Sequence, residues 1–96
     1  MKSTAYIFGA GGTGQRVLGI VKEKYKILGF VDNDKTKWGT SVFGYEIFPP
    51  DKLIQDIELD YVLLGTLMGY EELQIQMKEM GILPNTPFDR HIKRMV

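Results

Sequence analysis

The sequence contains no cysteine and only one histidine, His91, among its 96 residues. Disulfides and thiolate metal sites are therefore excluded, and a lone histidine would need several carboxylate partners to hold zinc. No apolar run approaches the roughly 18 residues of a membrane span, and no signal-peptide core follows Met1-Lys2. We therefore expect no metal site, no membrane span and a cytoplasmic protein.

An excess of charge of either sign is also missing, because 12 basic residues are matched by 12 acidic ones. No cluster of basic residues indicates nucleic-acid binding, and no charged tail indicates disorder. A chain of 96 residues has room for one small domain without a second core. The stretch 90–96 contains no signal that would end a secondary-structure element. We therefore expect residues 1–96 to be a single domain excised from a longer enzyme.

The sequence alternates short apolar runs with segments of helical periodicity. Apolar runs typical of strands cover residues 4–8, 27–31, 45–47, 61–65 and 82–88. Helical spacing of apolar residues predicts helices over about 14–24, 51–56 and 70–80. Such alternation requires parallel strands joined by right-handed crossovers. We therefore predict an α/β fold, a Rossmann-like three-layer sandwich with a small, mostly parallel sheet of about four to five strands.

Three finer expectations concern single segments. The polar stretch 32–44 is expected to be a long loop. In the short helix, Leu53, Ile54 and Ile57 are expected on the buried side. Two prolines interrupt the segment 82–88, which places it at an edge of the sheet.

The segment Gly9–Gly14 matches the pattern G-x-G-x-x-G, between a predicted strand and a predicted helix. We call it the glycine loop. Gly9 would allow the tight turn, and Gly11 would let a pyrophosphate approach the backbone. Gly14 would let the helix pack close to the first strand. Backbone N–H groups at the start of the helix would then face the phosphates of a ligand, assisted by the helix dipole.

An acidic residue, Asp32, ends the second predicted strand 23 positions after Gly9. In this fold a carboxylate there binds ribose hydroxyls, and its charge favours NAD over NADP because it disfavours a 2′-phosphate. Asp34 is an alternative ribose partner that the spacing does not exclude. Thr66 follows the predicted strand 61–65 at the same edge, where ligands bind in open sheets, or it caps the next helix.

Other side chains of this region have simpler interpretations. Lys35, Lys37 and Trp38 could contact a phosphate and a base or sugar, but the sequence favours a solvated loop with one packed aromatic. The alternative for the whole motif is a turn that only joins strand to helix, with Asp32 as a solvated loop residue. If the motif binds a ligand, the predicted site residues are Gly9, Gly11, Gly12, Thr13, Gly14, Asp32, Asn33 and Thr66.

In this order the sequence contains Tyr6-Ile7-Phe8-Gly9-Ala10-Gly11-Gly12, Gly29-Phe30-Val31-Asp32-Asn33-Asp34, Lys37-Trp38-Gly39 and Gly44-Tyr45-Glu46-Ile47. The set resembles a nucleotide-binding domain that is widespread in bacterial surface-polysaccharide biosynthesis. That domain forms the N-terminus of UDP-amino-sugar acetyltransferases and occurs in membrane-associated nucleoside-diphosphate-sugar epimerases and dehydratases. Related copies are attached to glycosyltransferases and sugar methyltransferases. The resemblance covers residues 4–83.

The resemblance implies two kinds of ligand. In the acetyltransferases the domain holds the UDP-sugar, and catalysis takes place in a separate β-helical domain. In the epimerases and dehydratases the corresponding fold holds NAD(P). Thr13 departs from the acetyltransferase pattern, which usually carries histidine at that position. No Tyr-x-x-x-Lys occurs anywhere in the chain, so the proton-transfer pair for the usual sugar oxidation is missing.

These features together predict a nucleotide-binding module for NAD or a UDP-sugar that serves polysaccharide and nucleotide-sugar metabolism. We expect it to have no catalytic residue of its own and to work with a fused or partner catalytic domain of a sugar-modifying enzyme or transferase. One alternative is a small NAD-dependent nucleotide-sugar epimerase, dehydratase or dehydrogenase. Another is a CoA-binding module, because related Rossmann domains use a similar glycine loop. The fold alone does not decide among these ligands.

Overall fold

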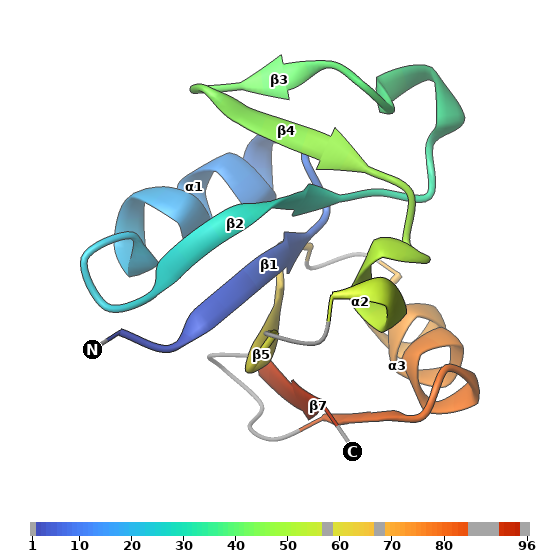
Figure 1. Ribbon diagram of the computed structural model, residues 1–96. Helices are drawn as coiled ribbons and strands as arrows, with labels where there is room; N and C mark the ends of the chain where they lie inside the picture. Colours follow the sequence, from blue (N-terminus) through green and yellow to red (C-terminus); the bar gives the residue numbers. More distant parts are fainter. Residues whose placement is uncertain (1, 57–58, 67–68, 85–90, 95–96) are drawn as a thin grey trace.

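A central β-sheet organises the chain, which the computed structural model describes over residues 2–56, 59–66, 69–84 and 91–94 (Figure 1). The strands are β1 (Thr4–Phe8), β2 (Lys26–Val31), β3 (Ser41–Val42), β4 (Tyr45–Phe48), β5 (Tyr61–Leu64), β6 (Ile82–Pro84) and β7 (His91–Arg94). The helices are α1 (Gly12–Val21), the 3-10 helix η1 (Lys35–Lys37), α2 (Lys52–Gln55) and α3 (Tyr70–Glu79).

The strands are arranged in the order β3-β4-β2-β1-β5-β7-β6. The four inner strands β4, β2, β1 and β5 run parallel to their neighbours in this group. At the margins β3 pairs antiparallel with β4, β7 with β5, and β6 with β7. The predicted α/β class and the parallel centre of the sheet are confirmed, as is the position of the last predicted strand at an edge.

Each of the five apolar runs predicted as strands contains a strand of the sheet, and the described residues add two short ones, β3 and β7, for seven in all. β3 has only two residues and lies inside a polar stretch, so it leaves no apolar run to detect. β7 covers His-Ile-Lys-Arg, which is equally poor in apolar residues. The stretch 32–44 is accordingly more ordered than a plain loop, since it contains η1 and β3. Residues 85–88 of the last predicted strand lie outside the described residues.

The two faces of β1 explain why its apolar run is continuous. Ala5 and Ile7 belong to the core cluster that includes Leu18 of α1. Tyr6 and Phe8 belong to the cluster on the other face, beneath α2 and α3 (Figure 1). A strand that is covered on both faces is apolar at every position instead of alternating. The molecule is thus a three-layer sandwich, with α1 on one side and α2 and α3 on the other.

The short helix α2 corrects one expectation. Leu53 is fully buried, whereas Ile54 is 48% exposed and points away from the core. Because α2 is little more than one turn, neighbouring positions lie about 100° apart, and only one of the two side chains faces the sheet. Ile57 lies outside the described residues. In the part of the chain that the structure describes, no helix is long and apolar enough to cross a membrane.

Candidate functional site

The carboxyl ends of β1, β2 and β5 meet at one edge of the sheet. The N–H of Gly9 donates to the carbonyl of Val31 at 2.8 Å, and the N–H of Gly65 donates to the carbonyl of Phe8 at 2.8 Å. Three chain segments therefore leave the sheet side by side. Between them and α3 lies a cleft of about 310 Å³, lined by Phe8, Gly9, Asp32, Asn33, Thr66, Gly69, Glu72, Leu73 and Gln76.

The structure brings four of the predicted site residues into the wall of this cleft, namely Gly9, Asp32, Asn33 and Thr66. The other four do not line it. Gly11, Gly12, Thr13 and Gly14 form the N-cap and first turn of α1, next to the cleft. The predicted residues therefore form two adjoining parts, a helix terminus and a hollow beside it.

Close backbone contacts at three glycines shape the turn between β1 and α1. Gly9 has φ +114°, a conformation that side-chain-bearing residues rarely adopt. A Cβ at Gly14 would overlap the carbonyl oxygen of Gly9 and lie 2.8 Å from its carbonyl carbon. A Cβ at Gly65 would lie 2.8 Å from the Cα of Gly14. Gly65 was not among the predicted site residues, although its position at the end of the predicted strand 61–65 was a usable signal.

The N-terminus of α1 has several free hydrogen-bond donors. Gly11 is the N-cap, with no side-chain cap and no acidic residue in the first turn. The first helical bond runs from Gln15 N–H to the Gly11 carbonyl at 3.0 Å. The N–H groups of Gly12, Thr13 and Gly14 have no acceptor among the described residues. Cβ atoms added at Gly11 or Gly12 would meet nothing within 4 Å. Free donors, open space and the positive end of the helix dipole suit an anion.

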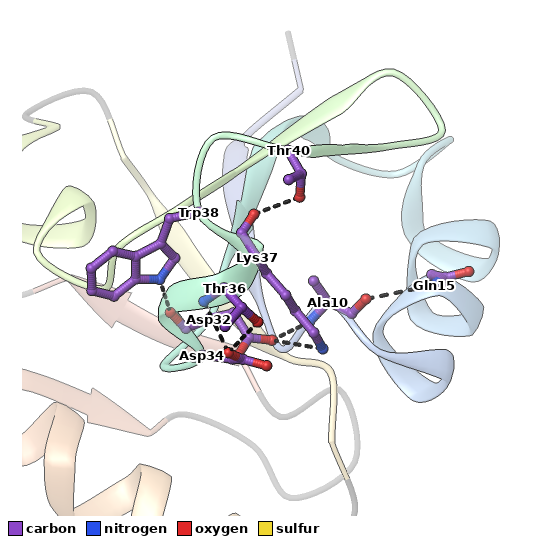
Figure 2. A network of polar contacts seen from close by, with 8 residues as sticks. All are labelled: Ala10, Gln15, Asp32, Asp34, Thr36, Lys37, Trp38 and Thr40. Carbon is purple, nitrogen blue, oxygen red and sulfur yellow. Dashed lines mark hydrogen bonds and ion pairs between the residues drawn. The ribbon is translucent and has the colours of Figure 1, made fainter.

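The carboxylate of Asp32 joins the end of β2 to the glycine loop (Figure 2). Its Oδ2 accepts the Ala10 N–H at 2.9 Å, and its Oδ1 accepts the Asp34 N–H at 2.8 Å. Lys37 Nζ lies 3.8 Å from Oδ2, and the carboxylate side chain is only 16% exposed. The indole N–H of Trp38 donates to the Asp32 carbonyl at 2.6 Å. Asp32 is therefore not a solvated loop residue, and its carboxylate retains unused lone pairs.

Asp34 has a different local role. Its Oδ1 accepts hydrogen bonds from the hydroxyl of Thr36 at 2.7 Å and from the Thr36 N–H at 3.0 Å. These bonds hold the pKa of Asp34 below its ordinary value, because they stabilise the charged carboxylate. Asp34 thus caps η1 and does not line the cleft. The geometry gives no support to Asp34 as the alternative ribose partner.

The far wall of the cleft comes from α3, which sequence analysis did not assign to the site. Glu72 and Gln76 stand one helical turn apart on the side of α3 that lines the cleft. The Asn33 amide donates to Gln76 Oε1 at 2.9 Å, and the Gln76 amide donates to Asn33 Oδ1 at 2.9 Å. This reciprocal pair ties the loop after β2 to α3. In the sequence, the only sign of this wall is that Glu72 and Gln76 are polar residues at helical spacing. A solvent-exposed face of the helix explains that pattern equally well.

The two parts of the site differ in their chemistry. The start of α1 offers N–H donors, which suit phosphate oxygens. The cleft offers the carboxylates of Asp32 and Glu72 and the amides of Asn33 and Gln76, which suit hydroxyl groups and the polar edges of a base. Among the described residues, no three His, Asp or Glu side chains gather as metal ligands would.

The order of the parallel strands and the glycine loop at their carboxyl edge define a Rossmann-type domain. More particularly, residues 1–88 match the family described as the C2185-like N-terminal domain, and the chain belongs to that family. The sequence matches none of the curated proteins.

A solved structure shares the fold. The chain is similar to the crystal structure of UDP-D-quinovosamine 4-dehydrogenase from Vibrio fischeri, with a TM-score of 0.67 and 20% sequence identity. The alignment covers 93% of this chain and 83% of that one. At this identity the likeness shows a common Rossmann-type architecture, consistent with the mostly parallel sheet described above.

Proposed function

We propose that this domain binds a nucleotide that carries a diphosphate, either NAD or a UDP-sugar, at the carboxyl edge of its sheet. The observation that carries the proposal is the uncapped start of α1, where the N–H groups of Gly12, Thr13 and Gly14 have no acceptor among the described residues. The Cβ positions of Gly11 and Gly12 open onto free space at the same place. Donors in this arrangement are suited to the diphosphate oxygens. The acceptors of the cleft would then bind the nucleoside.

Asp32 fits the ribose in this arrangement. Both of its carboxylate oxygens accept one backbone N–H, so the carboxylate is held in place while it keeps further lone pairs for hydroxyl groups. Asn33 follows Asp32 in the chain, and Glu72 and Gln76 stand on α3 at the far wall of the cleft; these side chains offer donors and acceptors to a base or a sugar. A pre-formed wall of this kind binds a ligand with little loss of side-chain freedom.

The structural likeness to a UDP-D-quinovosamine 4-dehydrogenase supports a place in nucleotide-sugar metabolism. The missing Tyr-x-x-x-Lys pair supports a binding role over turnover by this chain alone. Of the five tyrosines, Tyr6 is only 2% exposed and donates its hydroxyl to Asp56, which leaves it no role as a proton donor in the cleft. We therefore propose a binding module of a sugar-modifying enzyme or transferase.

A panel of ligands in a thermal-shift experiment tests the proposal. NAD, NADP, UDP, UDP-N-acetylglucosamine and CoA are compared with adenosine and uridine, which lack phosphate. A ligand at 100 times its Kd stabilises the folded state by about 2.7 kcal/mol, so a true ligand raises the melting temperature clearly. The proposal predicts a shift with NAD or with the UDP compounds. It is wrong if none of these raises the melting temperature, and NAD reduction with a nucleotide sugar would favour the enzyme instead.

A further inference from the structure

Lys37 directs its ammonium group to the glycine loop (Figure 2). Its Nζ lies 3.8 Å from Asp32 Oδ2, the same oxygen that accepts the Ala10 N–H. The side chain is 38% exposed, so the ammonium group stands at the surface of the site and is accessible to a ligand. It thus brings a positive charge to the carboxylate that holds Ala10 of the glycine loop, two residues before α1 begins.

The backbone around Lys37 is fixed from both sides. Its N–H donates to the Asp34 carbonyl at 3.0 Å, and its own carbonyl accepts the hydroxyl of Thr40. The next residue, Trp38, is anchored by its indole N–H to the Asp32 carbonyl. Lys35 belongs to the same 3-10 helix but makes no ion pair within the described part of the chain. Of the two lysines in η1, Lys37 is therefore the one that the fold holds toward Asp32 and the glycine loop.

The contact between Lys37 and Asp32 leaves the ammonium group available for a stronger partner. At 3.8 Å the two groups are farther apart than in a charge-assisted hydrogen bond, which is about 2.7–2.9 Å long. Partly exposed pairs of this kind are weak. A diphosphate at the start of α1 carries more negative charge than one carboxylate. A lysine has a flexible stem, and its ammonium group can move to a phosphate oxygen.

We propose that Lys37 is a specificity-determining residue that recognises the phosphate charge of the ligand and, in the free domain, neutralises Asp32. The inference rests on the proposed function and extends it to a residue outside the glycine loop. Without Lys37, the negative charge of Asp32 would stand unscreened beside the bound phosphates. The ligand class that the site selects is then a nucleoside diphosphate or its conjugates, in preference to an uncharged nucleoside.

Calorimetric titration of Lys37→Met tests the inference, with Lys35→Met as the matched control. The probes are UDP, NAD, inorganic pyrophosphate and uridine, each at low and at about 0.15 M salt. Lys37→Met should weaken binding of the phosphate-bearing probes by about tenfold, which corresponds to one charge-assisted contact, and should reduce the salt dependence of binding. Binding of uridine should not change. Lys35→Met should behave like the parent, and Lys37→Arg should retain most of the affinity.

Each of the other possible results contradicts a specific claim about Lys37 or about the proposed function. If the parent binds UDP or NAD and Lys37→Met binds it equally well, the role of Lys37 is wrong and the proposed function stands. If Lys37→Met weakens uridine as much as UDP, Lys37 only shapes the loop, and the charge recognition is wrong. If the parent binds none of the phosphate-bearing probes, the proposed function fails and this inference fails with it. The melting temperature of each variant in the absence of ligand verifies that it is folded.

Discussion

The carboxylate of Asp32 accepts the backbone N–H of Ala10 at 2.9 Å, which connects the carboxyl end of β2 to the glycine loop after β1. The two residues are 22 positions apart in the sequence. Because Asp32 also accepts the N–H of Asp34, one side chain holds two loops at the edge of the sheet. Asp32 therefore has a structural role in addition to the ribose contact that we propose for it.

The double role of Asp32 gives a prediction for its removal. Asp32→Ala should lower the free energy of unfolding by about 1–3 kcal/mol, because two backbone N–H groups lose their acceptor. It should also weaken UDP or NAD by about ten- to a hundredfold. Asp34→Ala removes a cap outside the cleft and should affect ligand affinity much less. Urea unfolding and calorimetry measure both quantities. Parent-like stability of Asp32→Ala would disprove the structural role.

The close approach at Gly14 gives a prediction about packing. Gly14→Ala should strongly destabilise the domain, because the new Cβ would overlap the Gly9 carbonyl oxygen. Gly19→Ala is the matched control in the same helix, where a Cβ meets nothing within 4 Å. It should stabilise the domain by about 0.5–1 kcal/mol, the usual preference of a helix for alanine over glycine. Equal melting temperatures for the two variants would show that the turn is not packed as described.

Gly11 tests the ligand site without disturbing the fold. Its φ of −82° suits any residue, and a Cβ there has open space around it. Gly11→Val should therefore fold like the parent but place a side chain where the phosphates are proposed to lie. Affinity for the ligand should fall at least tenfold, which is about 1.4 kcal/mol. Unchanged binding by a folded variant would contradict a phosphate site at the glycine loop.

The parts of the structure that were predictable from sequence depend on neighbours along the chain. The turn at Gly9, the helix after it and the strand before Asp32 follow from local patterns, and the structure has all three. The pair of Asn33 and Gln76 joins positions 43 residues apart, and no local pattern encodes such a contact. The direction of Lys37 likewise depends on how η1 folds back on the glycine loop. Local patterns thus indicated the location of the site but not its complete wall.

The last prediction concerns Tyr6 and the stability of the folded domain at alkaline pH. Its side chain is 2% exposed, and its hydroxyl donates to Asp56 Oδ2 at 3.1 Å. Burial, followed by the hydrogen bond to Asp56 and the charge of that carboxylate, raises the pKa of Tyr6 well above its ordinary value of 10.0. The folded domain therefore keeps Tyr6 neutral at a pH where the unfolded chain ionises it. The stability that depends on the neutral phenol is complete below pH 10 and is lost as the pH rises further.

Comparison of the parent with Tyr6→Phe isolates this effect, because all other titrating groups are common to both proteins. Near pH 7 the variant should be less stable by about 0.5–1.5 kcal/mol, the net value of one hydrogen bond. Above pH 10 the parent should lose about 1.4 kcal/mol of additional stability per pH unit, and the variant should not. The two stability curves should therefore converge and cross near pH 11, as measured by urea unfolding at each pH. A constant difference from pH 7 to pH 11 would mean that Tyr6 ionises as easily in the folded domain as in the unfolded chain.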